Sequence, residues 1–260
     1  LAVDINGKVW AWGNDYEGQL GNGSGSTSAV PMKVVGVNEQ GYLKNITTVA
    51  AGSTHSMALE KLDTIDNDCN GRVYTWGNDL RYSFDGVLGN GIEDGNSQTP
   101  VRVLAPEGQQ EYLENIVAIA AGWHHSMALE KLDPCDSNCN GRVYAWGDER
   151  WGLRIGDGKY EDYRGVNIPV LVLSGLQDEN PESNAPLENI VAISAGAGHS
   201  MALDVNGNVW TWGSNYCQDN LSWFKSLPFV DKYFGQLGIG MDVESKPTPV
   251  QVVAPDRNAD

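Results

Sequence analysis

The sequence predicts an all-β protein, a β-propeller built from repeated four-stranded units, and three observations lead to this prediction. A Trp-Gly pair recurs at Trp12, Trp76, Trp146 and Trp212, at intervals of 64, 70 and 66 residues. Strand-length pieces recur in the same order around each pair. No long segment has the periodicity of a helix. Antiparallel units that recur in this way stack face to face as the blades of a propeller.

Each repeat begins with two apolar pieces that have the length and composition of strands. The first piece reads "NITTVAAG" (45–52), "NIVAIAAG" (115–122) or "NIVAISAG" (189–196), and the second contains "HSMAL". An Asn-Gly pair follows the second piece in every repeat, at Asn6-Gly7, Asn70-Gly71, Asn140-Gly141 and Asn206-Gly207. Because Asn-Gly favours positive φ, these pairs predict tight hairpins.

The third piece carries two aromatic residues on one face of a strand. Trp10 and Trp12 are two residues apart, and the same placement recurs at Tyr74/Trp76, Tyr144/Trp146 and Trp210/Trp212. Side chains of this size predict that the pair fills the space between stacked sheets. The fourth piece begins with proline, as in "PVRV" (100–103) and "PVQV" (249–252), and completes the unit.

These pieces resemble a known repeat. The stretches "VWAWGNDYEGQLGNG" (9–23) and "VAAGSTHSMAL" (49–59), with the Pro-Val strand, resemble the regulator of chromosome condensation (RCC1-type) repeat. The resemblance covers nearly the whole chain and implies a propeller that usually has seven blades. It also implies two kinds of activity, because the family includes an exchange factor for a small GTPase and bacterial proteins that bind enzymes or other proteins through one propeller face.

The strand count predicts about four blades in one array of residues 1–260. Four strand pieces lie in each of 46–104, 116–173 and 190–253, and three lie in 1–35. The repeats are therefore expected at about 1–45, 46–115, 116–189 and 190–260, with an insertion at 217–234. We expect a fragment of a longer propeller, covered by its remaining repeats or by self-association; a closed four-bladed ring is the alternative.

Composition and charge restrict the partners. With 260 residues, 31 of them Gly and 41% hydrophobic, the chain can bury a continuous core. The formal charge of −17 disfavours nucleic acid and anionic membranes and favours basic partners or cations. No apolar run is long enough to cross a bilayer.

A stretch rich in His and Cys, residues 124–147, raises the question of a metal centre. His55, His125 and His199 are equivalent positions on separate units, which are expected about 10 Å apart. Zinc needs its ligands at about 2 Å, so these residues predict scaffold histidines, each bonded to a backbone carbonyl. His124 stands outside the repeat pattern and is a candidate surface residue.

The insertions in the second and third repeats resemble the first half of a calcium loop. Oxygen-bearing side chains alternate and a glycine follows. The candidate ligands are Asp66, Asp68 and Asn70 in one repeat and Asp136, Asn138 and Asn140 in the next. The acidic residue that closes such a loop is replaced by glycine, so Asp63 or Asp133 would have to contribute. The alternative is a solvated turn rich in Asp and Asn.

The cysteines bear on the compartment of the protein. Cys135 and Cys139 are spaced to close a small disulfide across the inserted loop, which would indicate an oxidising environment. With the sequons at Asn22, Asn45 and Asn220, this favours an extracellular or cell-surface location over a cytoplasmic one. Reduced thiols in a cytosolic protein are the alternative.

The clearest candidate for a binding surface is the insertion at 217–234, which is rich in aromatic residues. Its candidate contacts are Trp223, Phe224, Phe229 and Tyr233, and Trp151 lies on the corresponding loop of another repeat. The alternative is that the insertion folds down over its own propeller face.

No pattern predicts an enzyme. Ser56, Ser126 and Ser200 each follow a histidine on a strand, where neighbouring side chains point to opposite faces. The glycine-rich loops are followed by strands and not by the helix that a phosphate site needs. We therefore expect no catalytic residues and no cofactor beyond calcium. The first hypothesis is a non-enzymatic protein-binding propeller. The alternatives are a guanine-nucleotide exchange factor, although no stretch matches the family's exchange wedge, and a calcium-dependent extracellular module.

Overall fold

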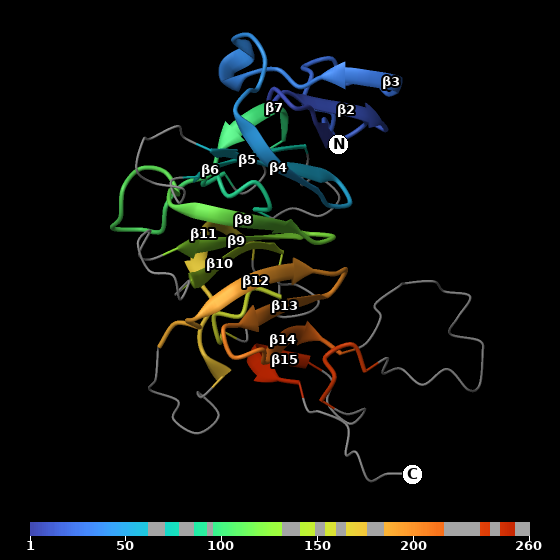
Figure 1. The fold of residues 1–260 in the computed structure, drawn as a ribbon. Coiled ribbons are helices and arrows are strands. Elements are labelled where there is room, and N and C mark those ends of the chain that lie inside the picture. The colour runs from blue at the N-terminus through green and yellow to red at the C-terminus, as the bar shows by residue number, and fades with distance from the viewer. Residues whose placement is uncertain are drawn as a thin grey trace, which may run out of the picture.

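The computed structural model describes residues 1–61, 71–77, 86–92, 96–131, 141–148, 154–159, 165–175, 185–215, 235–239 and 245–252. Within these ranges the regular elements are strands, apart from the short 3-10 helix η1 (Val37–Glu39). The strands form antiparallel sheets that stack face to face from the N-terminus to the C-terminus (Figure 1). The prediction of an all-β propeller architecture is confirmed.

The described strands form one sheet for each repeat. The first sheet has β1 (Ala2–Val3), β2 (Val9–Gly13) and β3 (Ser28–Lys33). The second has β4 (Ile46–Ala51), β5 (His55–Lys61), β6 (Gly71–Gly77) and β7 (Ser97–Arg102). The third has β8 (Ile116–Ala121), β9 (His125–Lys131), β10 (Gly141–Asp148) and β11 (Gly165–Leu171). The fourth has β12 (Ile190–Ala195), β13 (His199–Asp204), β14 (Val209–Ser214) and β15 (Ser245–Gln251). One pair, Gly141 with Ile190, joins the third and fourth of these units into an eight-stranded sheet; we keep the names third and fourth sheet for its two halves.

The strand registers define two faces of the molecule, one at each end of the strands. In the second sheet Gly77 pairs with both His55 and Ser97, so the β4–β5 turn and the β6–β7 connection lie at one end. We call this end the turn face and define it by the turns 51–55, 121–125 and 195–199, which point to the right in Figure 1. The opposite end, where the second strand of each sheet leads to the third, is the hairpin face.

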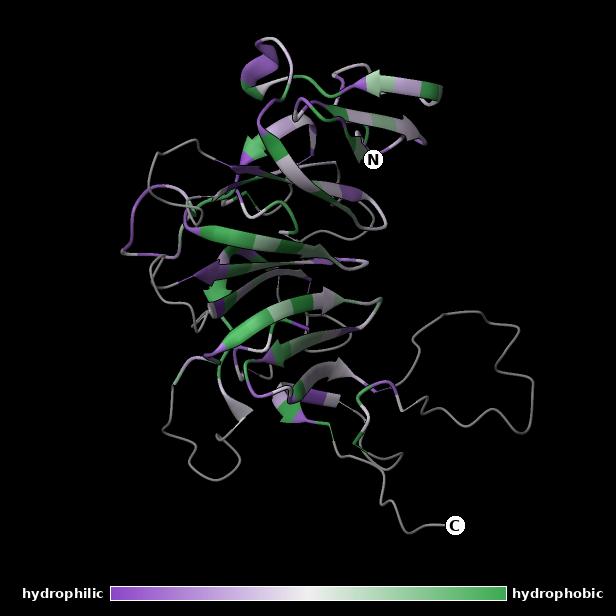
Figure 2. Ribbon diagram, in the orientation of Figure 1, coloured by the Kyte–Doolittle hydropathy of each residue, from purple (hydrophilic) through white to green (hydrophobic). Residues whose placement is uncertain are grey.

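The core lies between the sheets and is formed by large apolar and aromatic side chains. Figure 2 shows hydrophobic residues along the stacked strands. Trp76, Trp146 and Trp212 have no exposed surface, so each contributes on the order of 4–6 kcal/mol of transfer free energy. These three confirm the predicted filling of the space between sheets. Their equivalent in the first sheet, Trp12, is 47% exposed, and there the prediction is wrong because no described sheet packs on that side of it.

The prediction of positive φ at every Asn-Gly pair is half right. Gly7 (φ 71°) and Gly207 (φ 84°) turn tight hairpins as expected. Gly71 and Gly141 instead begin strands β6 and β10 and are not among the positive-φ residues. Their glycine is needed for space, because a Cβ on Gly71 would clash with the carbonyl oxygen of Ile116 in the next sheet. In the sequence these two repeats have eight more residues between "HSMAL" and the aromatic pair of the third strand than the fourth repeat has.

A left-handed asparagine precedes the first strand of each complete sheet. Asn45, Asn115 and Asn189 have φ values of 58°, 61° and 62°. Asparagine tolerates this conformation better than most residues. Their carbonyls accept hydrogen bonds from the amides of Lys61, Lys131 and Val205, so each turn is tied to the hairpin of its own sheet.

Candidate functional site

The candidate site residues predicted from the sequence lie outside the described residues. These are the calcium candidates Asp66, Asp68, Asn70, Asp136, Asn138 and Asn140, the cysteines Cys135 and Cys139, and the aromatic residues Trp151, Trp223, Phe224, Phe229 and Tyr233. The described strands on either side show only where these segments attach. The calcium and cysteine segments connect strands at the hairpin face, and the aromatic segments connect strands at the turn face.

At the turn face three equivalent turns from neighbouring sheets surround a hollow of about 230 Å³. Its lining consists of residues 51–53, 121–123 and 195–196. Most of these residues are alanine or glycine, so backbone atoms and methyl groups form much of the wall. No charged side chain belongs to this lining.

The amide groups of the three turns are already hydrogen bonded. The amides of Gly52, Gly122 and Gly196 donate to the carbonyls of His55, His125 and His199, at 2.9, 2.8 and 2.9 Å. The glycines are required because a Cβ on any of them would meet the imidazole of its own turn. These three amides are therefore not free to bind a ligand.

Trp123 breaks the repeat pattern at the rim of the hollow. Its side chain is 49% exposed, and its equivalents in the neighbouring turns are Ser53 and Ala197. The Trp123 amide donates to the carbonyl of Gly196 at 3.3 Å, and the Ser53 hydroxyl donates to the Trp123 carbonyl. The backbone of Trp123 is thus hydrogen bonded to both neighbouring turns, and its ring is half-exposed.

His124 lies beside this ring. The two ring centroids are 6.3 Å apart and the planes meet at 68°, an edge-to-face contact. The sequence identified His124 as a break in the pattern and missed Trp123. The signal was present, since the alignment of the repeats places tryptophan where the other two turns have serine and alanine.

Below the turns, the scaffold histidines connect neighbouring sheets. The Nε2 atom of His55 lies 3.0 Å from the hydroxyl of Ser126, and that of His125 lies 2.9 Å from the hydroxyl of Ser200. The expectation that each imidazole bonds to a backbone carbonyl is wrong for His55 and His125, because the partner of their Nε2 atoms is a serine of the next repeat. The sequence could not show a pair that forms between repeats.

The serine hydroxyls reach a carbonyl that also accepts a tryptophan. Ser126 donates to the carbonyl of Val87 at 3.0 Å, and the indole of Trp146 donates to the same oxygen at 2.9 Å. The next junction repeats this arrangement with Ser200, Trp212 and the carbonyl of Arg154. Each junction thus joins three polar groups from two sheets.

These buried pairs do not form a catalytic dyad. The Ser126 hydroxyl uses its proton for the Val87 carbonyl, so the His55 Nε2–H must donate to the serine oxygen and cannot act as its base. Both side chains are buried. Burial, with the nearby charge of His124, lowers the pKa of His55 to about 3, and burial lowers the pKa of His125 well below its usual value.

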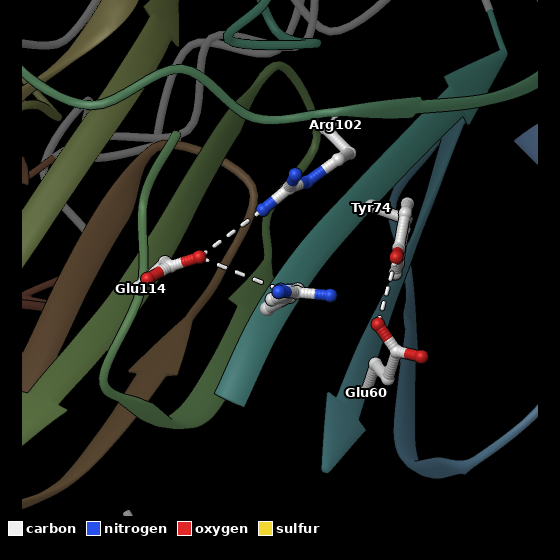
Figure 3. Close-up of polar contacts among 5 residues, drawn as sticks. Glu60, Tyr74, Arg102 and Glu114 are labelled. Atoms are coloured by element: carbon white, nitrogen blue, oxygen red, sulfur yellow. Dashed lines mark hydrogen bonds and ion pairs between the residues drawn. The ribbon is translucent and has the colours of Figure 1, made fainter. Parts of the chain in front are cut away.

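Several ionic contacts of the stack lie at the hairpin face. Figure 3 shows Glu60 accepting a hydrogen bond from the Tyr74 hydroxyl at 2.7 Å, and burial together with this bond raises the pKa of Tyr74 to about 12. It also shows Glu114, whose Oε1 lies 3.4 Å from Arg72 Nε and from Arg102 Nη2. These contacts join β6 and β7 to the segment that leads into the third sheet.

The third repeat uses the same residue types in a different pairing, since its arginine binds the glutamate of its own hairpin, and the short hairpins use another construction. Glu130 accepts from Arg142 at 2.8 Å and from Tyr144 at 3.3 Å. In the fourth repeat Asp204 instead accepts from two backbone amides of its own turn and from the indole of Trp210 at 3.1 Å. The Glu, Arg and Tyr set therefore accompanies the inserted segments.

Metal-binding clusters and membrane-spanning helices are both absent from the described part of the chain. Among those residues no three His, Cys, Asp or Glu side chains are grouped closely enough to hold a metal ion. No helix among the same residues is long and apolar enough to cross a membrane.

Comparison with protein families gives three matches. A sequence model described as the regulator of chromosome condensation (RCC1) repeat matches residues 6–59, 70–129 and 140–203, which is more than half of the chain. A second model of the same repeat matches residues 190–218. A model described as a candidate metal-binding motif matches residues 51–73 and 124–143, and these two ranges include both inserted segments.

Individual proteins are similar over most of this chain. Protein pim1 of Schizosaccharomyces pombe is 33% identical over 222 residues, which cover 82% of this chain and 35% of pim1. The ultraviolet-B receptor UVR8 of Arabidopsis thaliana is 31% identical over 258 residues, covering 98% of this chain and 44% of UVR8. The structure of Prp20p from Saccharomyces cerevisiae aligns with a TM-score of 0.62 at 22% identity and covers 97% of this chain and 48% of that one. The chain spans less than half the length of these relatives.

Proposed function

The chain belongs to the regulator of chromosome condensation (RCC1) repeat family, and from this premise we propose that it is a non-enzymatic module that binds a protein partner through its turn face. One observation carries the proposal. Trp123 is held half-exposed at the rim of a hollow, at a position where the other turns have small side chains. Exposed aromatic residues on a rigid support are frequent anchors of protein interfaces.

The topology adds support from the inserted segments. Strands β10 and β14 end at the turn face, so the segments containing Trp151 and 217–234 attach to the same face as Trp123. Repeated residues build the scaffold of a propeller, whereas departures from the repeat carry its function. Prp20p, which has this fold, binds Gsp1p and histones, and this is consistent with a protein partner for the present chain.

Replacement of 217–234 by the single glutamate that the first repeat has at Glu17 tests the proposal. We expect the variant of the full-length protein to lose partner capture in a pull-down and to keep its melting temperature. Unfolding on replacement would indicate that the segment covers its own sheet, and retained capture would contradict the proposal. Accelerated release of labelled nucleotide from a captured small GTPase would support the exchange-factor alternative.

A second proposal concerns the hairpin face, where we infer calcium binding by the inserted segments. The observation that favours it is the match of a candidate metal-binding motif to residues 51–73 and 124–143. The strand ladder brings the ends of each segment together, because Lys61 pairs with Gly71 and Lys131 pairs with Gly141. Asp and Asn oxygens are ligands that a hard cation such as calcium prefers, so the residues present fit the ion. The half-complete loop indicates weak affinity, which suits extracellular calcium concentrations.

Calorimetric titration tests this second proposal. We expect heat on addition of millimolar calcium and a rise in melting temperature, both reduced by the double substitution D66N and D68N in one segment and by D136N in the other. D204N on a short hairpin is the control and should leave the heat unchanged. Absence of heat and of a thermal shift in the unsubstituted protein would contradict calcium binding. The mass of the unreduced protein would show whether Cys135 and Cys139 form a disulfide.

A further inference from the structure

We infer that the hollow beside Trp123 seats a lysine or arginine side chain, so that the partner presents a basic segment to the turn face. This inference rests on the proposed function and specifies the chemistry of the partner. It follows from the groups that the hollow offers, from the position of the Trp123 ring, and from the charge of the chain.

Four backbone amides in the wall of the hollow are already used as hydrogen-bond donors. The amides of Gly52, Gly122 and Gly196 donate within their own turns, and the Trp123 amide donates to Gly196. The Ser53 hydroxyl is also used, since it donates to the Trp123 carbonyl. Carbonyl oxygens of the turns keep lone pairs that one hydrogen bond does not exhaust. A ligand that brings its own N–H donors therefore fits better than an anion, which would need donors from the wall.

The Trp123 ring supplies an aromatic face. A cation over an indole is stabilised by the negative face of the ring, and tryptophan is the best of the aromatic residues for this contact. Because the backbone of Trp123 is bonded to the turns on both sides, little backbone ordering remains to be done when a partner binds. An exposed ring on a hydrogen-bonded backbone, beside carbonyl oxygens, suits an ammonium or guanidinium group.

The size of the hollow and the charge of the chain restrict further which group can occupy the hollow. A volume of about 230 Å³ is smaller than the pockets that enclose drug-sized ligands, which begin at about 300 Å³, so the hollow suits one side chain of a larger partner. The formal charge of the chain is −17, with 34 acidic and 17 basic residues. This field attracts basic segments and repels acidic ones.

Peptide binding to the 260-residue chain tests the inference. The probe is a fluorescein-labelled peptide of alternating Arg and Gly, with peptides in which Gln or Glu replaces Arg as controls. Fluorescence anisotropy at low salt should show binding of the Arg peptide only. Trp123→Ser, which introduces the residue of the equivalent turn, should raise the dissociation constant about 3- to 30-fold. Trp123→Phe should keep part of the affinity, and Tyr42→Ser, which removes an exposed aromatic residue near the other end of the strands, should change nothing.

Three outcomes would overturn the inference. Equal binding by Trp123→Ser would place the cation elsewhere on the acidic surface. Full affinity in Trp123→Leu would indicate an apolar seat. Failure of the unsubstituted chain to bind the Arg peptide at low salt would exclude a basic partner at this hollow. The capture experiment separates these results from the proposed function: if capture depends on 217–234 while Trp123→Ser has no effect, the turn face binds a partner of other chemistry.

Discussion

At the scale of single residues, histidine and serine side chains connect one sheet to the next. Each junction holds an imidazole, a hydroxyl and an indole around one carbonyl oxygen, and the members come from two sheets. The hydroxyl proton goes to the carbonyl, so the imidazole carries its proton on Nε2. The Nδ1 atoms of His55 and His125 are buried and have no hydrogen-bond partner among the described residues. A second proton on either ring would therefore find no acceptor there.

Ser126→Ala should lower the free energy of unfolding by about 1–3 kcal/mol, because it removes the acceptor of the buried His55 N–H and one donor to Val87. Urea denaturation measures the change. Ser24→Ala is the matched control, since this exposed hydroxyl bonds only within its own loop, and it should have an effect within about 0.5 kcal/mol. Equal effects of the two substitutions would show that the junction bond does not stabilise the stack.

Acid should destabilise the protein through these histidines. Burial lowers the pKa of His55 to about 3 in the folded state, whereas an unfolded histidine titrates near 6.5. Below about pH 6.5 the unfolded chain binds more protons, so stability is complete above that pH and is lost as the pH falls toward 3. The slope should approach about 1.4 kcal/mol per pH unit for each buried histidine.

Denaturation between pH 7 and pH 4.5 measures this slope, and imidazole nitrogen shifts report the tautomer directly. His124→Gln, which removes a histidine outside the buried pairs, should keep most of the slope. An imidazole of His55 or His125 that titrates near pH 6.5 in the folded protein would contradict the buried, neutral state.

At the scale of elements, the same Asn-Gly pair serves two structural purposes. In the short hairpins the glycine supplies positive φ, and at Gly207 it also has open space around it. In the repeats with inserted segments the glycine lies in a strand and makes room for the next sheet, as at Gly71. The first role tolerates asparagine, which adopts positive φ, and the second tolerates no side chain.

Asparagine substitutions should separate these two roles. Gly207→Asn should cost less than about 1 kcal/mol, because asparagine adopts the left-handed conformation that the turn needs. Gly71→Asn should cost more than about 2 kcal/mol, since its Cβ would push against the carbonyl of Ile116. Thermal unfolding of both variants checks the difference, and a similar loss in both would mean that the contact with Ile116 relaxes easily.

The elements were predictable from the sequence because their signals are local. Alternation within a strand placed Trp76, Trp146 and Trp212 in the core, and the recurring pieces gave the strand order. The roles of Gly71 and the partner of His55 were not predictable, since both depend on atoms of the next repeat. Sequence spacing within one repeat contains no information on such contacts.

The candidate site was predictable in part for the same reason. His124 was found because it breaks the repeat, and a comparison of the three turns would have found Trp123 in the same way. The hollow itself required the structure, because three turns separated by about seventy residues form it together.

At the scale of the whole molecule, similar junctions join each sheet to the next, and each junction uses hydrogen-bonding groups from both sheets. The carbonyls of Gln19, Val87 and Arg154 accept the indoles of the following repeats. Repeat arrays of this kind gain stability mainly from nearest neighbours. Trp12 has the sequence position of an indole donor and is 47% exposed, so the outer side of the first sheet offers a junction surface.

We expect this surface to be covered, by a further repeat or by a second copy of the chain. In the fourth repeat Gln236 has the position that Gln19 has in the first. The outer surface of the fourth sheet therefore has the position of a carbonyl acceptor, and the outer surface of the first sheet has the position of an indole donor. Contact between unlike surfaces of two copies is head to tail, and it produces rings or open chains. Sedimentation velocity of residues 1–260 should therefore show association that increases with concentration. Trp12→Ser should weaken it, whereas Tyr42→Ser should not. A chain that stays monomeric at high concentration, with Trp12 open to an aqueous quencher, would exclude a second copy as the cover and leave a further repeat as the occupant that the surface fits.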